Sequence, residues 1–283
     1  MCTNAAGFAS QDSVLYGLKA QIGKLERYLK GMGAVYLKNS DKADFVSLTG
    51  GEPALHPDFF RLLVYFRKRL PGIHITLLSN GRRFADGQFA RRFAKAAKAP
   101  FTAAVPVHGA SARIHDLVAG VSGAFKETMA GLDNLFSLSG ARIEIRVVLH
   151  RLNIGDFKRL LAFLLKRFPA SERWGIAVIH YEIEGMSSEN HKRLALKLSE
   201  SARIINSALP LIAKFRDIRF YHFPLCLIRE ELRPNCRITL PDEDRIYAEK
   251  CAGCRVRKRC LGLMAEYYRQ FGDVELKAQG RQG

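Results

Sequence analysis

Residues 45–53 read Phe-Val-Ser-Leu-Thr-Gly-Gly-Glu-Pro, and this stretch decides the fold. A short apolar, β-branched run ends abruptly at two glycines, which is typical of a buried strand that gives way to a turn. Residues 57–70 then follow a helical pattern, with Pro57 suited to the helix start and Pro71 with Gly72 to its end. The stretch therefore predicts a strand, a turn and a helix, which together begin a series of βα units.

The alternation of strands and helices continues along the chain and indicates a parallel sheet with right-handed crossovers. We expect a closed or partly closed (β/α) barrel rather than an open sheet, because polar residues and glycines fall at the end of strand after strand. Those segments are 50–53, 79–81, His108, His150 and 182–185. Further strands are expected at 73–78, 101–107, 143–149, 175–183 and 218–223, and helices at 11–30, 84–98, 123–137, 154–168 and 188–215.

Composition limits the class of protein. A chain of 283 residues with 48% hydrophobic content can bury one substantial core. The formal charge of +18 favours polyanions or acidic peptides as partners, with a solvated basic surface as the alternative. No run approaches the ~20 apolar residues that span a bilayer, and the N-terminus lacks the layout of a signal peptide. We therefore expect a cytoplasmic protein that does not enter a membrane.

The six cysteines are distributed unevenly, with Cys2 at one end and the other five in the last quarter of the chain. Without a secretion signal, clustered cysteines indicate metal or iron–sulfur ligation before disulfides. The pattern from Cys251 through Cys254 to Cys260 is typical of a metal loop, because a short turn lets two sulfurs converge. A structural zinc site made from the same thiolates is the alternative.

The turn at 50–53 resembles the GGEP motif of the radical S-adenosylmethionine (radical SAM) enzymes. The resemblance implies an α/β fold, a partial (β/α) barrel over residues 1–224, followed by a small cysteine-rich extension over 225–283. It also implies a site for S-adenosylmethionine (SAM), in which the turn holds the amino group of the methionine moiety. The residues expected there are Gly50, Gly51, Glu52 and Pro53, with Asn80 as a further contact and Arg146 against the SAM carboxylate.

The family also carries a C-x-x-x-C-x-x-C loop one βα unit earlier, whose three thiolates bind a [4Fe–4S] cluster and leave one iron for SAM. Only the last of those cysteines is matched here, by Cys2, and the strand expected before the loop is missing. A single cysteine cannot hold such a cluster. We expect that the sequence begins too late, at an internal methionine; the alternative is a degenerate relative in which Cys2 is an accidental thiol.

The C-terminal cysteines resemble the SPASM or twitch region of this family, which implies an auxiliary [4Fe–4S] cluster. Its expected ligands are Cys226, Cys251, Cys254 and Cys260, with Cys236 left over. Residues 105–109 and 123–128 resemble maturases that modify ribosomally made peptides, such as those of His-Xaa-Ser systems. This resemblance implies a peptide or small-protein substrate and an electron donor such as a flavodoxin or ferredoxin.

Three other interpretations stay open. The first is a non-catalytic partner or scaffold that keeps only the C-terminal metal site, and the second is an RNA-modifying radical enzyme, suggested by charge alone. The third is a metal-dependent hydrolase that uses His108, His150 and His180, which follow successive strands but lack the usual paired histidines. The sequence predicts neither the substrate, the general base nor the oligomeric state.

Overall fold

The computed structural model describes residues 16–32, 45–169, 171–240 and 242–280, so Cys2 lies outside the described residues. The chain forms two compact units. The N-terminal unit comprises Ala6–Pro106 and Gly123–Glu144, and the C-terminal unit comprises Val107–Ser122 and Ile145–Gly283. No helix in the described ranges is both long enough and apolar enough to cross a membrane.

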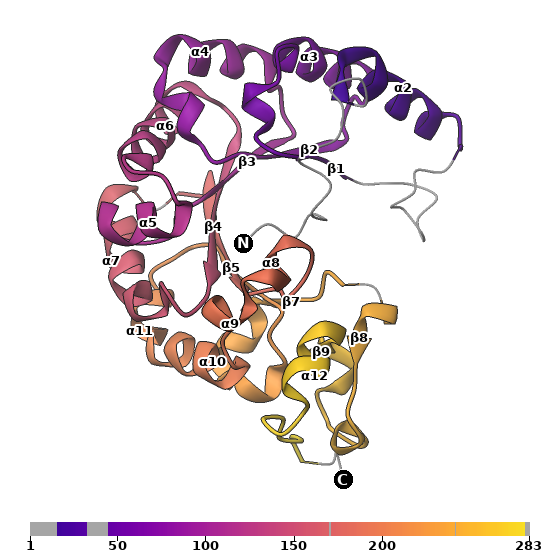
Figure 1. Ribbon diagram of the computed structural model, residues 1–283, viewed down its shortest axis with the longest axis vertical. Coiled ribbons are helices and arrows are strands. Elements are labelled where there is room, and N and C mark those ends of the chain that lie inside the picture. Colours follow the sequence, from indigo (N-terminus) through magenta and orange to yellow (C-terminus); the bar gives the residue numbers. More distant parts are fainter. Residues whose placement is uncertain (1–15, 33–44, 170, 241, 281–283) are drawn as a thin grey trace. The chain divides into compact units, whose positions relative to one another are not determined.

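The N-terminal unit is built on parallel strands that pair in chain order, with Phe45 opposite His74 and Ile75 opposite Phe101. Its helices flank these strands (Figure 1) and bury a set of phenylalanines, among which the rings of Phe84 and Phe93 lie 4.8 Å apart. The strands are β1 (Phe45–Leu48), β2 (His74–Leu78) and β3 (Phe101–Pro106), and the helices are α2 (Leu18–Leu29), α3 (Phe59–Arg69), α4 (Gly87–Ala96) and α6 (Ala124–Leu138).

Close packing of two glycines fixes the turn after β2. A Cβ at Gly131 of α6 would lie 2.1 Å from the carbonyl oxygen of Gly81, and Gly81 itself has a φ of +81°. A side chain at Gly131 would therefore push α6 away from the turn, and the left-handed backbone at Gly81 favours glycine as well. The helix thus holds the segment that contains Asn80.

The C-terminal unit continues the same architecture. Strand β4 (Arg142–Leu149) runs into it from the N-terminal unit, and every residue of β5 (Trp174–His180) is buried. Strands β5 and β6 pair in parallel with Ile179 opposite Tyr221, and β6 pairs with β7 in the same way. The other elements are α5 (Ala112–Ala119), α7 (Phe157–Arg167), α8 (Met186–Glu189), α9 (His191–Leu194), α10 (Leu198–Ser207), α11 (Leu209–Ile212), β6 (Ile218–Tyr221), β7 (Cys236–Arg237), β8 (Arg245–Ile246), β9 (Leu263–Met264) and α12 (Ala265–Phe271).

The parallel pairing and the strand–helix alternation in both units confirm the predicted partial (β/α) barrel. The predicted long helix at 188–215 is wrong, because four short helices occupy this stretch. The backbone is extended at Ala195 and Lys197, and the apolar side chains around them are buried. Helix α5 was not predicted, because its eight residues make only about two helical turns, too few to set a period apart.

The C-terminal extension packs on helix α10. The hydroxyl of Tyr267 accepts a hydrogen bond from the backbone N–H of Leu198 at 2.7 Å, and Glu275 accepts one from the N–H of Ser199 at 3.1 Å. The extension therefore shares a compact unit with the later strands of the barrel. The expected domain boundary at residue 224 stays a prediction.

Candidate functional site

The turn between β1 and the following 3₁₀ turn (Pro53–Leu55) carries no side chain at Gly50 and Gly51. Within the described ranges, a Cβ built at either glycine would meet no atom within 4 Å, and Gly50 has a φ of +148°, which only glycine adopts readily. A ligand can therefore approach the backbone of this turn without displacing a side chain. We call residues 50–53 the glycine turn.

Glu52 holds the glycine turn in place through three hydrogen bonds. Its Oε1 accepts from the N–H of Ala54 at 3.0 Å and from the hydroxyl of Ser79 at 2.6 Å, and its Oε2 accepts from the N–H of Asn80 at 2.6 Å. The carboxylate thus joins the end of β1 to the end of β2. Because these donors engage both oxygens, the Glu52 side chain shapes the site, and its predicted contact with SAM stays a prediction.

The other predicted SAM contacts lie on two different units. In the N-terminal unit, Oδ1 of Asn80 accepts from the N–H of Arg82 at 2.9 Å, and its carbonyl accepts from the hydroxyl of Thr128 at 3.2 Å. Arg146 lies on β4 in the C-terminal unit, where its carbonyl accepts from the N–H of Val107 at 2.9 Å. Their roles in SAM binding stay predictions.

The C-terminal unit brings the four cysteines expected at the auxiliary site to one pocket. Cys226, Cys251, Cys254 and Cys260 all line it, and we call it the cysteine pocket. Its volume of about 20 Å³ is close to that of a water site and too small for an organic ligand. The chemistry that this pocket offers is therefore that of its thiols.

Backbone N–H groups point at two of the sulfurs. Cys260 Sγ accepts from the N–H of Leu225 at 3.3 Å and from that of Gly262 at 3.4 Å, and Cys254 Sγ accepts from the N–H of Gln279 at 3.4 Å. Hydrogen bonds of this kind stabilise thiolates and tune metal centres. The pocket is thus lined with donors that suit sulfur in its charged form.

Burial opposes that charged form. It raises the pKa of the Cys226 and Cys251 thiols, and it raises the pKa of Cys236 to about 12. Cys236 packs beside Cys254 and Cys260 but does not line the pocket. Among the described residues, no three His, Cys, Asp or Glu side chains surround one point as a single metal ion requires. Metal binding by the cysteine pocket stays a prediction.

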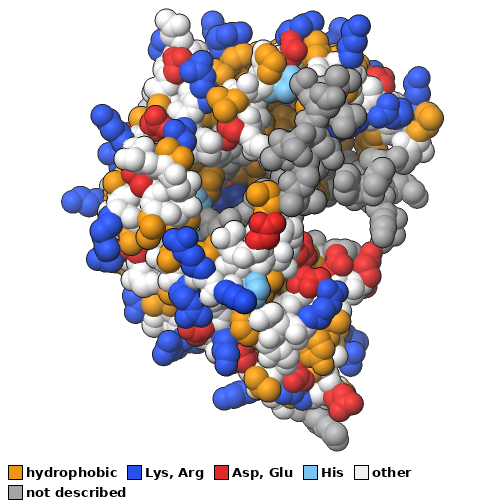
Figure 2. Space-filling model, in the orientation of Figure 1, with side chains coloured by type: hydrophobic (Ala, Val, Ile, Leu, Met, Phe, Trp, Pro, Cys, Tyr) orange, Lys and Arg blue, Asp and Glu red, His pale blue; other side chains and the backbone are white. Residues whose placement is uncertain are grey.

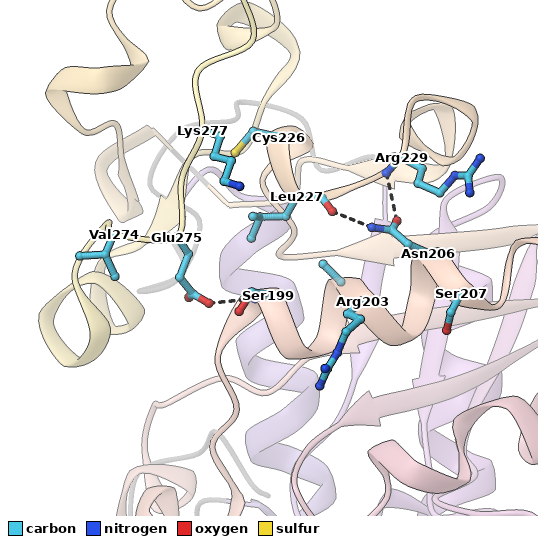
Figure 3. Close-up of a pocket in the computed structure, with 11 residues that line it drawn as sticks. Ser199, Arg203, Asn206, Ser207, Cys226, Leu227, Arg229, Val274, Glu275 and Lys277 are labelled. Atoms are coloured by element: carbon cyan, nitrogen blue, oxygen red, sulfur yellow. Dashed lines mark hydrogen bonds between the residues drawn. The ribbon is translucent and has the colours of Figure 1, made fainter.

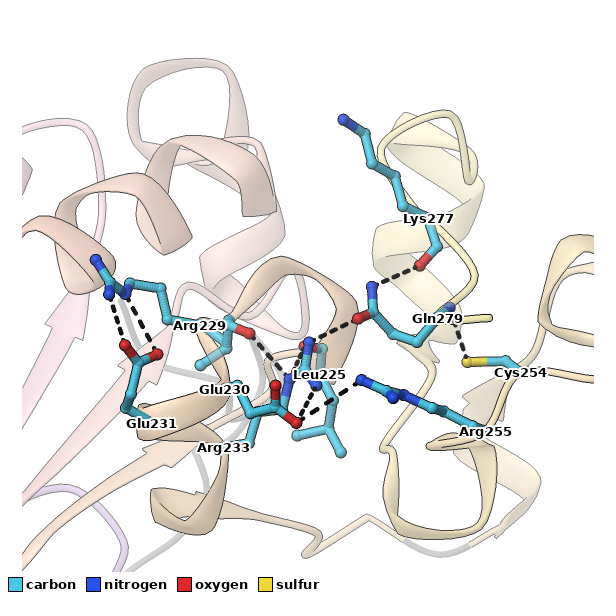
Figure 4. A network of polar contacts seen from close by, with 10 residues as sticks. Leu225, Arg229, Glu230, Glu231, Arg233, Cys254, Arg255, Lys277 and Gln279 are labelled. Carbon is cyan, nitrogen blue, oxygen red and sulfur yellow. Dashed lines mark hydrogen bonds and ion pairs between the residues drawn. The ribbon is translucent and has the colours of Figure 1, made fainter. Parts of the chain in front are cut away.

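Arg233, whose side chain is 14% exposed, holds chain segments beside the cysteine pocket (Figure 4). The Nε of Arg233 donates to the carbonyls of Leu225 and Ile228, both at 3.1 Å, and its Nη2 donates to Oε1 of Gln279 at 2.8 Å. Gln279 is the residue whose N–H meets Cys254. Arg233 therefore fixes two of the three chain segments that carry N–H donors to the sulfurs, those of Leu225 and Gln279. Sequence reasoning missed it, because nothing in the spacing of residues marks an arginine as the partner of carbonyls.

An open groove of about 630 Å³ lies beside the cysteine pocket, between α10 and the segment 274–277 (Figure 3). Cys226 and Lys277 line both hollows. The amide of Asn206 is held by the carbonyl of Leu227 and the N–H of Arg229, at 2.9 and 3.0 Å. Within the part of the chain that the structure describes, Arg203 and Lys277 have no carboxylate partner. The groove therefore offers two free positive charges.

The histidines of the hydrolase interpretation do not form a metal site among the described residues. His180 is 1% exposed and lies 3.0 Å from the hydroxyl of Ser201. His108 contacts His115 through its backbone N–H, and His150 accepts from the N–H of Leu152. Burial lowers the pKa of His108 and His180 to about 3 and that of His150 to about 4, so all three imidazoles are neutral at physiological pH.

The glycine turn lies at the carboxyl end of a parallel strand, which is where (β/α) barrel proteins bind their ligands. The fold and the place of the turn therefore put the chain in this class of proteins. Residues 19–164 match the radical SAM superfamily, and the chain therefore belongs to that superfamily. This assignment overturns the hydrolase interpretation.

Curated proteins of two kinds resemble the chain. The mycofactocin maturase MftC of Mycobacterium ulcerans is 32% identical over 129 residues, which cover 46% of this chain and 33% of that protein. The maturase of Mycobacterium tuberculosis H37Rv is 30% identical over 129 residues, which cover 46% and 31%. An AdoMet-dependent heme synthase of Oleidesulfovibrio alaskensis is 29% identical over 135 residues, which cover 48% and 31%. The match thus spans about a third of the length of these relatives.

Proposed function

We propose that this protein is a radical SAM enzyme whose glycine turn binds the methionine moiety of SAM. The observation that carries the proposal is the Glu52 carboxylate, which joins the ends of β1 and β2 through hydrogen bonds of 2.6–3.0 Å beside two residues that carry no side chain, Gly50 and Gly51. Such a turn suits an amino-acid-like ligand, because the ligand can come close to the main chain without a side chain in the way. Asn80 and Arg146 are the further contacts that we propose.

When bound, the family's [4Fe–4S] cluster supplies the electron that cleaves SAM to a 5′-deoxyadenosyl radical, which abstracts hydrogen from the substrate. The residues of this chain bind and orient SAM beside it. Cys2 is the proposed cluster ligand from this chain, and it lies outside the described residues. A non-catalytic scaffold is the alternative function.

For the cysteine pocket we propose an auxiliary [4Fe–4S] cluster, with structural zinc as the alternative. Four thiols on one pocket and the N–H donors to Cys254 and Cys260 support a site for metal-bound thiolates. Iron and acid-labile sulfide in the purified, anaerobically reconstituted protein would support the cluster. Zinc in place of both would support the structural site.

We propose a peptide as the substrate, because the related maturases are named for mycofactocin maturation. We also propose a cytoplasmic protein that receives electrons from a flavodoxin or ferredoxin. The groove beside Cys226 suits an acidic donor, since Arg203 and Lys277 line it. RNA is less well supported, because Lys and Arg are scattered over the face in Figure 2 rather than gathered into a stripe.

The decisive experiment measures 5′-deoxyadenosine released from SAM by the anaerobically reconstituted protein. We expect product with the wild-type sequence and a large loss with Cys2→Ala or Glu52→Ala, while Cys236→Ser retains activity. The test is run on the complete reading frame of the gene. Metal sufficient for the C-terminal site together with no 5′-deoxyadenosine would favour the scaffold.

A further inference from the structure

The C-terminal ends of β5 and β6 hold a histidine in a strained backbone conformation. His222 directly follows β6 and has a φ of +70°; among the described residues it is the one with a Cβ and a positive φ. A left-handed backbone costs free energy for such a residue, and strain of this kind concentrates at functional sites. The position therefore calls for a reason beyond the turn itself.

A carboxylate from the neighbouring strand faces this histidine. Oε1 of Glu182 lies 3.0 Å from Nδ1 of His222, whose side chain is 6% exposed, whereas the Glu182 side chain is 27% exposed. Strands β5 and β6 already pair in parallel there, with Ile179 opposite Tyr221. The contact between Glu182 and His222 therefore adds little stability there, because backbone hydrogen bonds already join β5 and β6. Nδ1 of His222 makes no hydrogen bond within the described residues, so Glu182 acts on the ring through its charge at 3.0 Å. The other ring nitrogen, Nε2, can meet another partner.

The loop that carries Glu182 is tied down. The hydroxyl of Ser187 donates to the carbonyl of Glu182 at 2.5 Å and accepts from the N–H of Glu184 at 3.0 Å, and the hydroxyl of Tyr181 donates to the carbonyl of Ser187 at 2.5 Å. Burial and the nearby Glu182 raise the pKa of Glu184. The loop therefore places two carboxylates, Glu182 and Glu184, near His222.

We propose that His222, with the Glu182 carboxylate beside it, is the acid–base group that exchanges a proton with the substrate. The inference rests on the proposed function, because it assumes a peptide over the carboxyl ends of the strands, where barrel enzymes react. In the forward direction a bond from hydrogen to a substrate atom breaks, its electron pair stays on the substrate, and the proton goes to Nε2. The Glu182 carboxylate then stabilises the imidazolium, as a carboxylate does in a catalytic triad.

Acylation by diethyl pyrocarbonate at about pH 8, where free imidazoles are neutral, followed by peptide mapping, tests the proposal. We expect His222 to react at least about tenfold faster than His180, which is 1% exposed, and more slowly than the more exposed His191 on α9. Glu182→Gln should slow His222 about threefold while His191 keeps its rate. A His222 as inert as His180, or one that is indifferent to Glu182→Gln, would overturn the proposal.

The variant His222→Asn separates this role from a structural one, because asparagine accepts a left-handed backbone. We expect its melting temperature to equal or exceed that of the wild type, because asparagine relieves the strain at a φ of +70°. A clear drop in melting temperature would show that the ion pair serves the fold, and the proposal would fail. Neither measurement uses SAM, so the outcome is independent of whether the protein cleaves SAM.

Discussion

The glycine turn and the cysteine pocket differ in what holds them. Around the glycine turn, one carboxylate accepts hydrogen bonds from Ala54, Ser79 and Asn80, so the shape of the turn is maintained by the protein's own groups. In the cysteine pocket, burial raises the pKa of the Cys226 and Cys251 thiols and so favours their protonated forms. A metal must displace those protons before the sulfurs become ligands.

The difference teaches how each site responds to its ligand. Hydrogen bonds hold the glycine turn in shape before a ligand binds. Binding therefore costs little conformational entropy. A thiol pocket gains its stability from the metal, because the free energy of binding becomes free energy of folding. Each of the first three changes below acts on one site and leaves the other as its control.

The largest effect is expected from Cys260→Ser, which removes the sulfur that accepts from both Leu225 and Gly262. We expect at least about a tenfold loss of bound metal and a much lower melting temperature of the C-terminal unit. Metal analysis and calorimetry measure this. The matched control is Cys236→Ser, because Cys236 does not line the pocket. Equal metal loss in both variants would mean that the pocket has been assigned the wrong ligands.

Glu52→Ala should have the next largest effect, in the N-terminal unit. Three donors lose a common acceptor, which we expect to cost roughly 3 kcal/mol of the free energy of unfolding, measured by urea denaturation. SAM affinity, measured by calorimetry, should fall about a hundredfold if a similar free energy is lost from binding. Glu127→Ala is the control, because its ion pair with Arg82 is largely exposed and contributes under about 1 kcal/mol. A Glu52→Ala protein with unchanged SAM affinity would contradict the pinning role.

Arg233→Met should weaken the cysteine pocket without touching a sulfur. The Arg233 side chain is 14% exposed and donates to two carbonyls and to Gln279, so its loss should cost about 2 kcal/mol of the free energy of unfolding. Metal affinity should fall about 10-fold or more, as for other groups that orient ligands. Arg229→Met is the control, since Arg229 pairs with Glu231 at the surface. Equal effects of the two changes would refute the supporting role.

The smallest effect is a pH dependence of the C-terminal unit. Burial lowers the pKa of His180 to about 3, so the imidazole stays neutral in the fold, whereas the unfolded chain takes up a proton below about pH 6.5. Stability is therefore present above that pH and is lost as the pH falls towards 3. Between pH 6.5 and 5.5 the share of His180 in the lost stability is about 1 kcal/mol. His180→Phe should flatten the pH profile of unfolding by that amount, and an unchanged slope would contradict the assignment.

The sequence predicted the parallel (β/α) architecture because its strands and helices carry local periods and end at glycines and prolines. It failed at 188–215, where apolar residues continue a helical period although the backbone is extended at Ala195 and Lys197. Burial of Leu194 and Leu196 outweighs the local preference for helix there. Tertiary packing decided this stretch, and the period alone could not reveal it.

The candidate sites divide in the same way. The glycine turn and the metal loop are short segments, so their residues could be named from spacing alone. Ser79 as a partner of Glu52, Arg233 behind the cysteines and Glu182 facing His222 come from separate segments. Such pairings follow from the fold and leave no pattern along the chain.

By itself, the sequence determined the family motif, the alternation of elements and the cysteines that could bind metal, because each of these depends on neighbours along the chain. Only the tertiary structure decided that Glu52 joins two strand ends and that four cysteines share a pocket while Cys236 stays outside its lining. It also decided that His222 has a left-handed backbone and lies 3.0 Å from Glu182. The physical reason is that hydrogen bonds, burial and ion pairs depend on distance in space, which the fold sets.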